Sequence, residues 1–144
     1  MRISTRTRYG FRALAELAKG YPNIPISLKQ ISTNQNISLK YLEQVIATLK
    51  AAGIVRAVRG NNGGYLLTRP PAQMTLKDPF LALEGTPILL SCLDEPDHCS
   101  TQVICSTRVT WENIEKAILG VLDSTTIEDL RQQSLQPESP DYTI

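Results

Sequence analysis

The chain has 144 residues, enough for one full-sized domain or for one small domain with an appendage. Its apolar runs, such as Ile88-Leu89-Leu90, are far shorter than a membrane span, and its N-terminus lacks an apolar signal-peptide core. We therefore expect a cytoplasmic protein without a membrane partner. The net charge of +1 conceals an asymmetry, because residues 1–69 sum to +9 and residues 70–144 to −8. A basic half suits DNA phosphates, and ordinary solvated surface is the alternative.

The N-terminal region predicts two helices separated by a loop. Apolar residues at helical spacing predict the first helix over 8–19. Two prolines exclude helix from the loop that follows. Ser27 and Gln30 then form a capping box for a short second helix, which breaks at residues 34–36.

Residues 37–70 predict a third helix followed by a basic hairpin. Ser38 is a good N-cap, and apolar residues recur at helical spacing up to Gly53, where a left-handed residue would end the helix. Two short strand-like segments, 54–58 and 65–68, flank a loop of residues that tolerate positive φ. Together with the preceding helix, this order predicts a winged helix-turn-helix, a module that binds duplex DNA.

The polar face of the third helix and the basic hairpin supply the candidate DNA contacts. Gln44 suits a bidentate bond to adenine, and Glu43 can accept from cytosine N4. Arg59 at the hairpin tip suits a narrow minor groove. Phosphate contacts, which set register but not sequence, are predicted for Lys29, Lys40 and Tyr41. The complete candidate set is Lys29, Ser38, Lys40, Tyr41, Glu43, Gln44, Arg56 and Arg59. The alternative is that these polar residues are merely solvated.

The acidic half predicts a helix over 75–84, a long segment over 86–106 without periodicity, and a long helix over 107–122. The long helix has a wide apolar stripe, which suits a dimer interface, and burial against its own subunit is the competing interpretation. A short capped turn then precedes residues 134–144, which have little apolar content.

These elements predict a mainly α fold with a small β-hairpin wing, of the α+β class. We expect a winged helix-turn-helix DNA-binding domain over 1–72. A cysteine-bearing sensor loop and dimerisation helix would follow over 73–133, and a disordered tail over 134–144.

Three cysteines, Cys92, Cys99 and Cys105, lie in the segment without periodicity. An odd number of cysteines in a cytosolic protein is a poor basis for disulfides. Their spacing lacks the Cys-x2-Cys pair of structural zinc sites, so zinc is disfavoured. Soft thiolates on a loop suit an iron–sulfur cluster, which normally takes four ligands. Thiol redox chemistry without a metal, and incidental cysteines, are the alternatives.

Several segments resemble the IscR/NsrR/CymR family of bacterial winged-helix repressors. The matching segments are Met1-Arg2-Ile3-Ser4, Arg8-Tyr9, Tyr41-Leu42-Glu43-Gln44, residues 53–59, Gly63-Gly64-Tyr65-Leu66-Leu67 and Glu84-Gly85, together with the three cysteines. The resemblance extends to about residue 130. It implies a homodimer that crosses its long C-terminal helices and binds a palindromic operator in double-stranded DNA. It also implies an iron–sulfur cluster on the cysteines, for which we favour 2Fe–2S over 4Fe–4S.

The fourth ligand of such a cluster is unknown. One branch of the family has a histidine three positions after the third cysteine, where this chain has Arg108, and another uses a carboxylate where this chain has Arg8. His98 adjoins Cys99, so both could ligate only through an awkward local turn. The remaining candidates are an exogenous ligand and Asp94, Glu95 and Asp97.

The sequence therefore predicts a DNA-binding transcriptional regulator, of the repressor type, that responds to an iron–sulfur cluster. The alternative is a winged-helix regulator controlled by a protein partner or by thiol oxidation, without a cluster. An enzyme is not expected, because the chain has one histidine, no Gly-rich phosphate loop and no nucleophile–base spacing.

Overall fold

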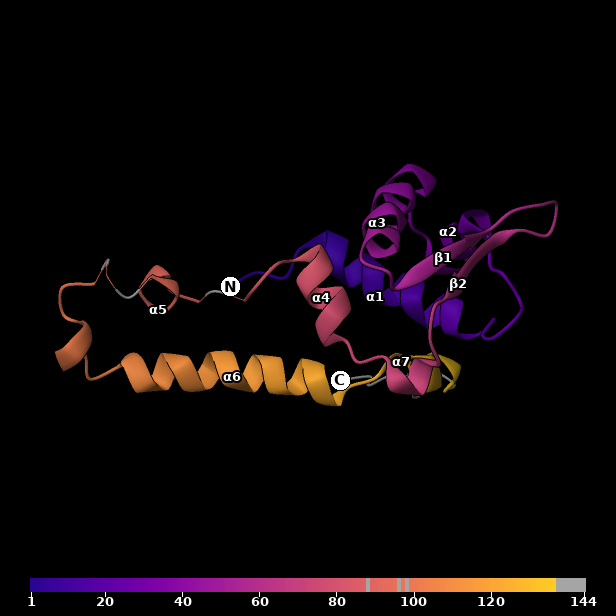
Figure 1. Ribbon diagram of the computed structural model, residues 1–144. Coiled ribbons are helices and arrows are strands. Elements are labelled where there is room, and N and C mark those ends of the chain that lie inside the picture. The colour runs from indigo at the N-terminus through magenta and orange to yellow at the C-terminus, as the bar shows by residue number, and fades with distance from the viewer. Residues whose placement is uncertain (88, 96, 98, 137–144) are drawn as a thin grey trace, which may run out of the picture.

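The protein is described by a computed structural model, which covers residues 1–87, 89–95, 97 and 99–136. Its elements are α1 (Thr5–Ala18), α2 (Leu28–Gln35), α3 (Leu39–Ala51), β1 (Val55–Val58), β2 (Gly64–Leu67), η1 (Pro71–Gln73), α4 (Lys77–Leu83), α5 (Ser91–Asp94), η3 (Gln102–Ile104), α6 (Arg108–Ser124) and α7 (Ile127–Leu135). Helices α1–α4, the hairpin and α7 form one body, and α6 projects from it as an arm (Figure 1). The predicted mainly α fold with a β-hairpin is confirmed. No helix in the described ranges is long and apolar enough to cross a membrane.

Capping side chains set where the first two helices begin. Ser4 caps α1 by accepting a hydrogen bond from the Thr7 amide at 3.2 Å. The helix therefore starts before the predicted residue 8, because apolar spacing identifies only the buried part of a helix. The predicted capping box of α2 is confirmed: the Ser27 and Gln30 side chains each accept from the other residue's amide, both at 3.1 Å.

The turn into α3 depends on one residue with a left-handed backbone. Asn36, with φ of 51°, ends α2, and short polar side chains tolerate this conformation better than most. Ser38 then caps α3 by accepting from the Tyr41 amide at 3.1 Å, as predicted. Gly53, with φ of 73°, ends the helix at the predicted position.

The hairpin forms the predicted wing. β1 and β2 pair antiparallel, from Val55 opposite Leu67 to Val58 opposite Gly64. Ile26, in the loop before α2, exchanges two backbone hydrogen bonds with Tyr65, of 2.9 and 3.1 Å. The base of the wing is thereby fixed to the helix-turn-helix.

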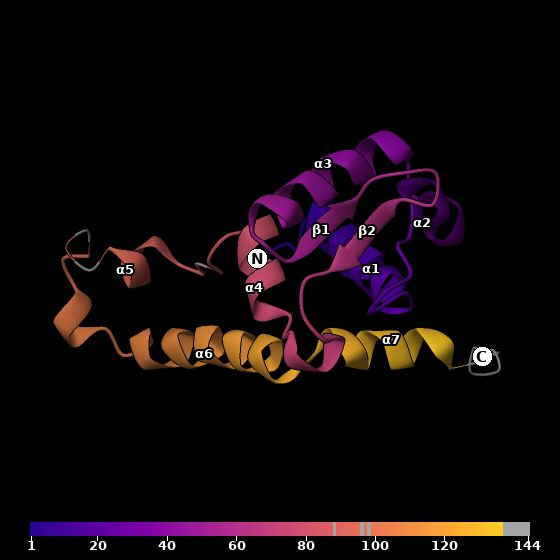
Figure 2. The ribbon, with the colours of Figure 1, turned by 45° about the vertical axis from the view of Figure 1, so that its right-hand side comes forward.

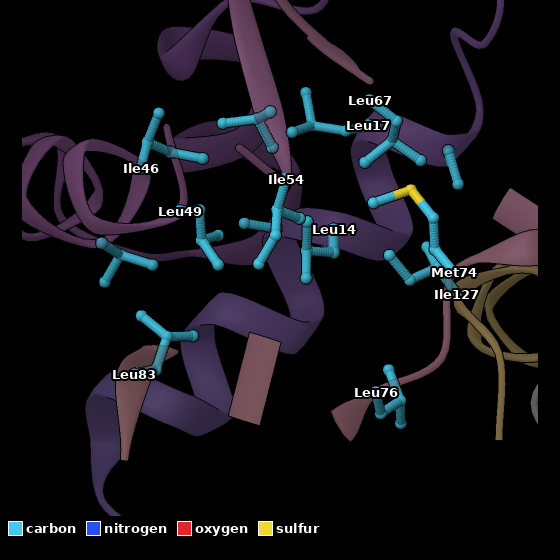
Figure 3. Packing of buried hydrophobic residues seen from close by; sticks show 14 of the residues in the cluster. Leu14, Leu17, Ile46, Leu49, Ile54, Leu67, Met74, Leu76, Leu83 and Ile127 are labelled. Carbon is cyan, nitrogen blue, oxygen red and sulfur yellow. The ribbon is translucent and has the colours of Figure 1, made fainter. Parts of the chain in front are cut away.

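A single apolar core joins the helices to the wing (Figure 3). Its fully buried members include Leu14, Leu17, Ile31, Leu42, Val45, Leu49, Leu67, Met74 and Ile127. Burying each large aliphatic side chain stabilises the fold by about 1.5–3 kcal/mol. Gly10 allows α1 to approach α4 closely, because a Cβ at this position would lie 2.3 Å from a methyl carbon of Leu83.

The C-terminal helix returns to the DNA-binding half. The Leu76 amide donates to the Thr125 carbonyl at 2.9 Å, and the Ile127 amide donates to the Met74 carbonyl at 2.8 Å. α7 then packs along α1. The sequence predicted a DNA-binding domain over 1–72 and a separate sensor and dimerisation region over 73–133. In the structure, α4 and α7 of the second region share the apolar core of the first (Figure 2).

The last helix is also longer than the predicted capped turn. α7 runs through Leu135, so Ser134 and Leu135 are helical although the sequence assigned them to the tail over 134–144. The Thr126 and Asp129 capping box fixes its start. Residues 137–144 of the predicted tail lie outside the described residues.

Glu84, which ends α4, holds the N-terminus of α1. Its carboxylate accepts hydrogen bonds from the Ser4 amide at 3.1 and 3.2 Å, from the Ser4 hydroxyl at 2.6 Å, and from the Thr7 hydroxyl. The hydrogen bonds from Ser4 and Thr7 lower the pKa of Glu84 below its ordinary value. The carboxylate therefore stays charged at neutral pH, at a helix N-terminus where negative charge is favourable.

Candidate nucleic-acid interface and cysteine loop

The polar face of α3 is exposed at three of the candidate DNA-contact residues. Lys40, Glu43 and Gln44 are exposed, and they lie opposite the side that Leu42 and Val45 bury in the core. All three lie in the first half of the helix, the part of a recognition helix that reaches base edges. The structure thus brings these three candidates together on one surface.

Ser38 and Tyr41 have structural roles beside this surface. The Ser38 hydroxyl is engaged as the cap of α3. The half-buried Tyr41 ring packs edge-on against Tyr9 of α1, with centroids 5.5 Å apart and planes at 85°. Whether either side chain also contacts DNA stays a prediction.

The basic candidates outside α3 are all exposed. Arg56 lies on β1, and Arg59 lies in the wing loop beside Gly60, whose φ of 115° requires glycine. Lys29 lies in the first turn of α2. The wing loop projects from the body at the end away from the α6 arm (Figure 1).

Arg6 is a basic neighbour of α3 that the sequence analysis did not identify. Its guanidinium donates to the Thr48 hydroxyl on α3, and its side chain is exposed. Arg6 precedes the predicted start of α1, so no signal in the sequence pointed to its place beside the third helix. It adds positive charge to the same side of the molecule.

We expect Gln44→Ala to relax the preference of the protein at one base pair. The exposed Gln44 amide can bond both ring-edge atoms of adenine, and truncation removes this readout at a cost of roughly 1–3 kcal/mol. Binding titrations on an operator and its single-base variants would measure the loss. An unchanged preference at every position would contradict a base-reading role for this residue.

The three cysteines lie along the segment that joins α4 to α6. Cys92 lies in α5, Cys99 precedes η3 and Cys105 follows it; all three are free thiols and half-buried. The Cys99 sulfur lies 3.5 Å from the Thr101 hydroxyl oxygen, and the Cys105 sulfur lies 3.5 Å from that of Thr107. Figure 2 shows this segment running beside α6.

Hydrogen bonds and a nearby guanidinium favour two of the thiolates. The side chain and backbone of Thr101 lower the pKa of Cys99, and those of Thr107 lower the pKa of Cys105. The Arg108 guanidinium lowers both further. Thiolates are the reactive and metal-binding form of cysteine.

Arg108 occupies the position where a fourth ligand was considered and cannot serve as one. It donates to the Cys92 carbonyl at 3.3 Å and pairs with Glu112 at 2.8 Å, which fixes α5 to the start of α6. Within the described ranges, no three His, Cys, Asp or Glu side chains are gathered to hold a metal ion. His98 lies outside the described residues. The three cysteine sulfurs on this segment are soft donors, the type that iron–sulfur clusters bind.

The α6 helix exposes most of its predicted apolar stripe. Trp111, Ile114 and Val121 are 38%, 39% and 64% exposed, and Ile118 is half-buried against the core. Where α6 meets α1 and α4 there is an apolar groove of about 320 Å³, called here the α6 groove. It is lined by Ile3, Thr7, Arg8, Phe11, Phe80, Ile118, Val121 and Leu122.

Known proteins share this arrangement. A family model named Rrf2 and described as an iron-dependent transcriptional regulator matches residues 3–133. The HTH-type transcriptional regulator CymR of Bacillus subtilis is 40% identical over 130 residues, covering 90% of this chain and 89% of CymR.

Solved structures agree with the sequence comparison. The structure of CymR, described as the global cysteine regulator of B. subtilis, has a TM-score of 0.75 at 38% identity and covers 92% of this chain and 98% of CymR. The structure of IscR from T. potens has a TM-score of 0.75 at 34% identity, and the match covers 96% of this chain and 94% of the IscR chain. The predicted resemblance is confirmed. The chain belongs to the Rrf2 family of DNA-binding transcriptional regulators, which are not enzymes.

Proposed function

We propose that this regulator is a homodimeric repressor that binds a palindromic operator, and that an iron–sulfur cluster on Cys92, Cys99 and Cys105 controls its DNA affinity. The observation that carries this proposal is the placement of the cysteine segment. It connects α4, which packs on α1 and α3, to α6, which carries the exposed apolar stripe. A change in this segment therefore acts at the junction between the recognition helix and the dimerisation helix.

Apolar residues near both ends of α6 support the proposal of a dimer. Trp111 lies near the N-terminal end of the helix and is exposed, whereas Val121 lies near the C-terminal end and lines the α6 groove. An antiparallel pairing of two α6 helices about a two-fold axis would place Trp111 of each copy against the α6 groove of the other. Such an isologous contact closes on itself and covers both apolar surfaces.

DNA binding by such a dimer follows from its symmetry. A two-fold dimer presents two copies of α3 and two wings, so it matches two half-sites about one helical turn apart. Gln44 and Glu43 would read base edges, and Arg59 would enter a minor groove. Lys29, Lys40 and Arg56 would hold phosphates.

The cysteine segment supplies the donors for the cluster. The pKa values of Cys99 and Cys105 are lowered by the neighbouring Thr101 and Thr107 and by Arg108. This favours the thiolate form, which is the form that binds a metal. A bound cluster would supply an iron- and redox-sensitive cross-link, with 2Fe–2S favoured over 4Fe–4S. Because the fourth ligand is not a residue at position 108 or 8, we expect labile binding, which suits a sensor.

Thiol chemistry without a metal is the second candidate. The favoured thiolates of Cys99 and Cys105, which are not gathered with a third ligand in the described ranges, would also suit oxidation. The relative CymR is described as a cysteine regulator, which gives this candidate a precedent.

Anaerobic purification distinguishes the two candidates. We expect freshly purified protein to be coloured, to contain iron and sulfide, and to bleach in air. The Cys99→Ala variant should lose the visible absorbance, whereas Ser106→Ala, beside a ligand but without a donor sulfur, should retain it. A colourless wild-type protein without iron, whose Cys99 and Cys105 thiols react readily with an alkylating reagent, would favour the thiol candidate instead.

A further inference from the structure

A buried carboxylate on α1 faces the turn between α2 and α3. The Glu16 side chain is 3% exposed. It accepts hydrogen bonds from the Lys19 ammonium at 2.6 Å, the Asn34 side-chain amide at 3.0 Å and the Gln35 side-chain amide at 2.7 Å. Of these donors, Asn34 and Gln35 belong to the end of α2, immediately before the left-handed Asn36. Glu16 therefore ties α1 to the tight turn of the helix-turn-helix.

The carboxylate is charged in this environment. Burial acts to raise the pKa of Glu16, but the hydrogen bonds from Lys19, Asn34 and Gln35 outweigh it and hold the pKa below its ordinary value. Hydrogen bonds to a charged acceptor are about twice as strong as those between neutral groups. The turn is thus held more firmly than an ordinary polar loop.

The same contacts continue to the first turn of α3. The Arg12 guanidinium donates to the Gln35 side-chain oxygen at 2.9 Å and to the Gln35 carbonyl. It also lies over the Tyr9 ring, 5.5 Å from the centroid, and Tyr9 contacts Tyr41 of α3 edge-on. A connected set of polar and aromatic contacts therefore runs from Glu16, through Gln35 and Arg12, to the N-terminal end of α3.

We propose that Glu16 and Arg12 are positioning residues for DNA recognition, which set the angle at which α3 presents Gln44 without touching DNA themselves. The apolar core holds the buried face of α3 along its length. The Glu16–Arg12 contacts act instead on the N-terminal end, the part that enters the major groove. Base readout requires side chains to be held within about 0.5 Å and 10–20° of the productive geometry, so a small change of angle affects specific contacts first.

This inference rests on DNA recognition through α3, and it predicts a separation that a purely structural role would not give. Phosphate contacts tolerate small displacements, because long basic side chains can follow the backbone. We therefore expect loss of the network to weaken operator binding and to leave non-sequence-specific binding unchanged. The salt dependence, which counts phosphate contacts, should also stay constant.

The test measures affinity for an operator and for an unrelated duplex at several salt concentrations. Glu16→Gln keeps the side-chain shape but replaces one acceptor oxygen by an amide donor. At least one of the three donors then lacks a partner, because Lys19 and Gln35 share one oxygen and Asn34 uses the other. We expect operator affinity to fall roughly tenfold, with affinity for the unrelated duplex and the salt slope unchanged. The wild-type ratio of the two affinities, measured in the same titrations, tests operator recognition itself.

Two further variants serve as a stability control and as a substitute for Glu16→Gln. Glu84→Gln weakens a comparable set of hydrogen bonds at the other end of α1, away from the turn, so it should cost stability without changing the affinity ratio. Gln35→Ala removes the link between Glu16 and Arg12 from a more exposed position and should reproduce the Glu16→Gln result if that variant does not fold. Folded Glu16→Gln or Gln35→Ala protein with the wild-type affinity ratio would overturn the proposal. So would an equal fall on both duplexes.

Discussion

Val121→Asp is expected to produce monomers that no longer bind a palindromic operator tightly. Val121 is 64% exposed in the single chain and lines the α6 groove. The change should therefore lower the free energy of unfolding of the isolated subunit only slightly. In the proposed dimer, however, it would place an unpaired carboxylate in each of two apolar contacts, at a penalty of several kcal/mol per charge. Because a palindrome requires a two-fold protein, DNA affinity should fall together with dimerisation.

Sedimentation at micromolar concentration measures this effect, and the position of the charge provides its control. Leu135→Asp makes the same kind of change at an exposed site on α7, 57% exposed and outside the α6 groove, and should remain dimeric. Ile118→Asp is less informative because Ile118 also packs against the core of its own subunit. A Val121→Asp variant that sediments as a dimer would exclude the α6 groove from the interface.

Arg59→Glu is expected to weaken binding to all DNA sequences and to reduce its salt dependence. Arg59 is exposed in the wing loop, where it can meet the backbone or a narrow minor groove, both strongly negative. Each cationic side chain lost from the negatively charged DNA lowers the salt slope by about one, so the proposed dimer with two wings should lose about two. The reversed charge adds repulsion, so affinity should fall more than for Arg59→Ala.

The matched control for this prediction is Arg69→Glu. Arg69 follows β2 at the base of the hairpin, is 54% exposed, and lies 3.8 Å from Asp78. The net charge of the protein changes equally in both variants, so a general electrostatic effect would weaken both alike. An equal loss of affinity in the two variants would mean that the wing tip makes no specific contact with DNA.

Local signals predicted the DNA-binding half closely. The Ser27 capping box, the Ser38 cap and Gly53 depend only on residues near one another in sequence, so they could be identified without a structure. The return of α7 to the core could not, because Ile127 contacts residues far away along the chain. The Ser4–Glu84 contact was missed for the same reason. The start of α1 was missed although its Ser4 cap is a local contact, because apolar spacing identified only the buried part of the helix.

In the candidate site, too, local patterns were predicted from the sequence and contacts between helices were not. The exposed face with Lys40, Glu43 and Gln44 follows from helical spacing, and the structure brings these residues together. The neighbouring Arg6 and the Tyr9–Tyr41 contact depend on how α1 crosses α3, which spacing does not determine. Likewise, the spacing of the cysteines identifies possible ligands but not the distances between them.

Control of DNA binding by the cysteines is tested most directly by comparing operator affinity in three preparations at one salt concentration. These are anaerobically purified wild type with the proposed cluster, the same protein after the cluster is removed, and Cys99→Ala. The cysteine segment connects α4 to α6, so cross-linking it should alter the spacing of the two α3 helices in the proposed dimer. We expect the first preparation to differ from the other two, which should agree with each other. Equal affinities in all three would contradict control of DNA binding by the cysteines.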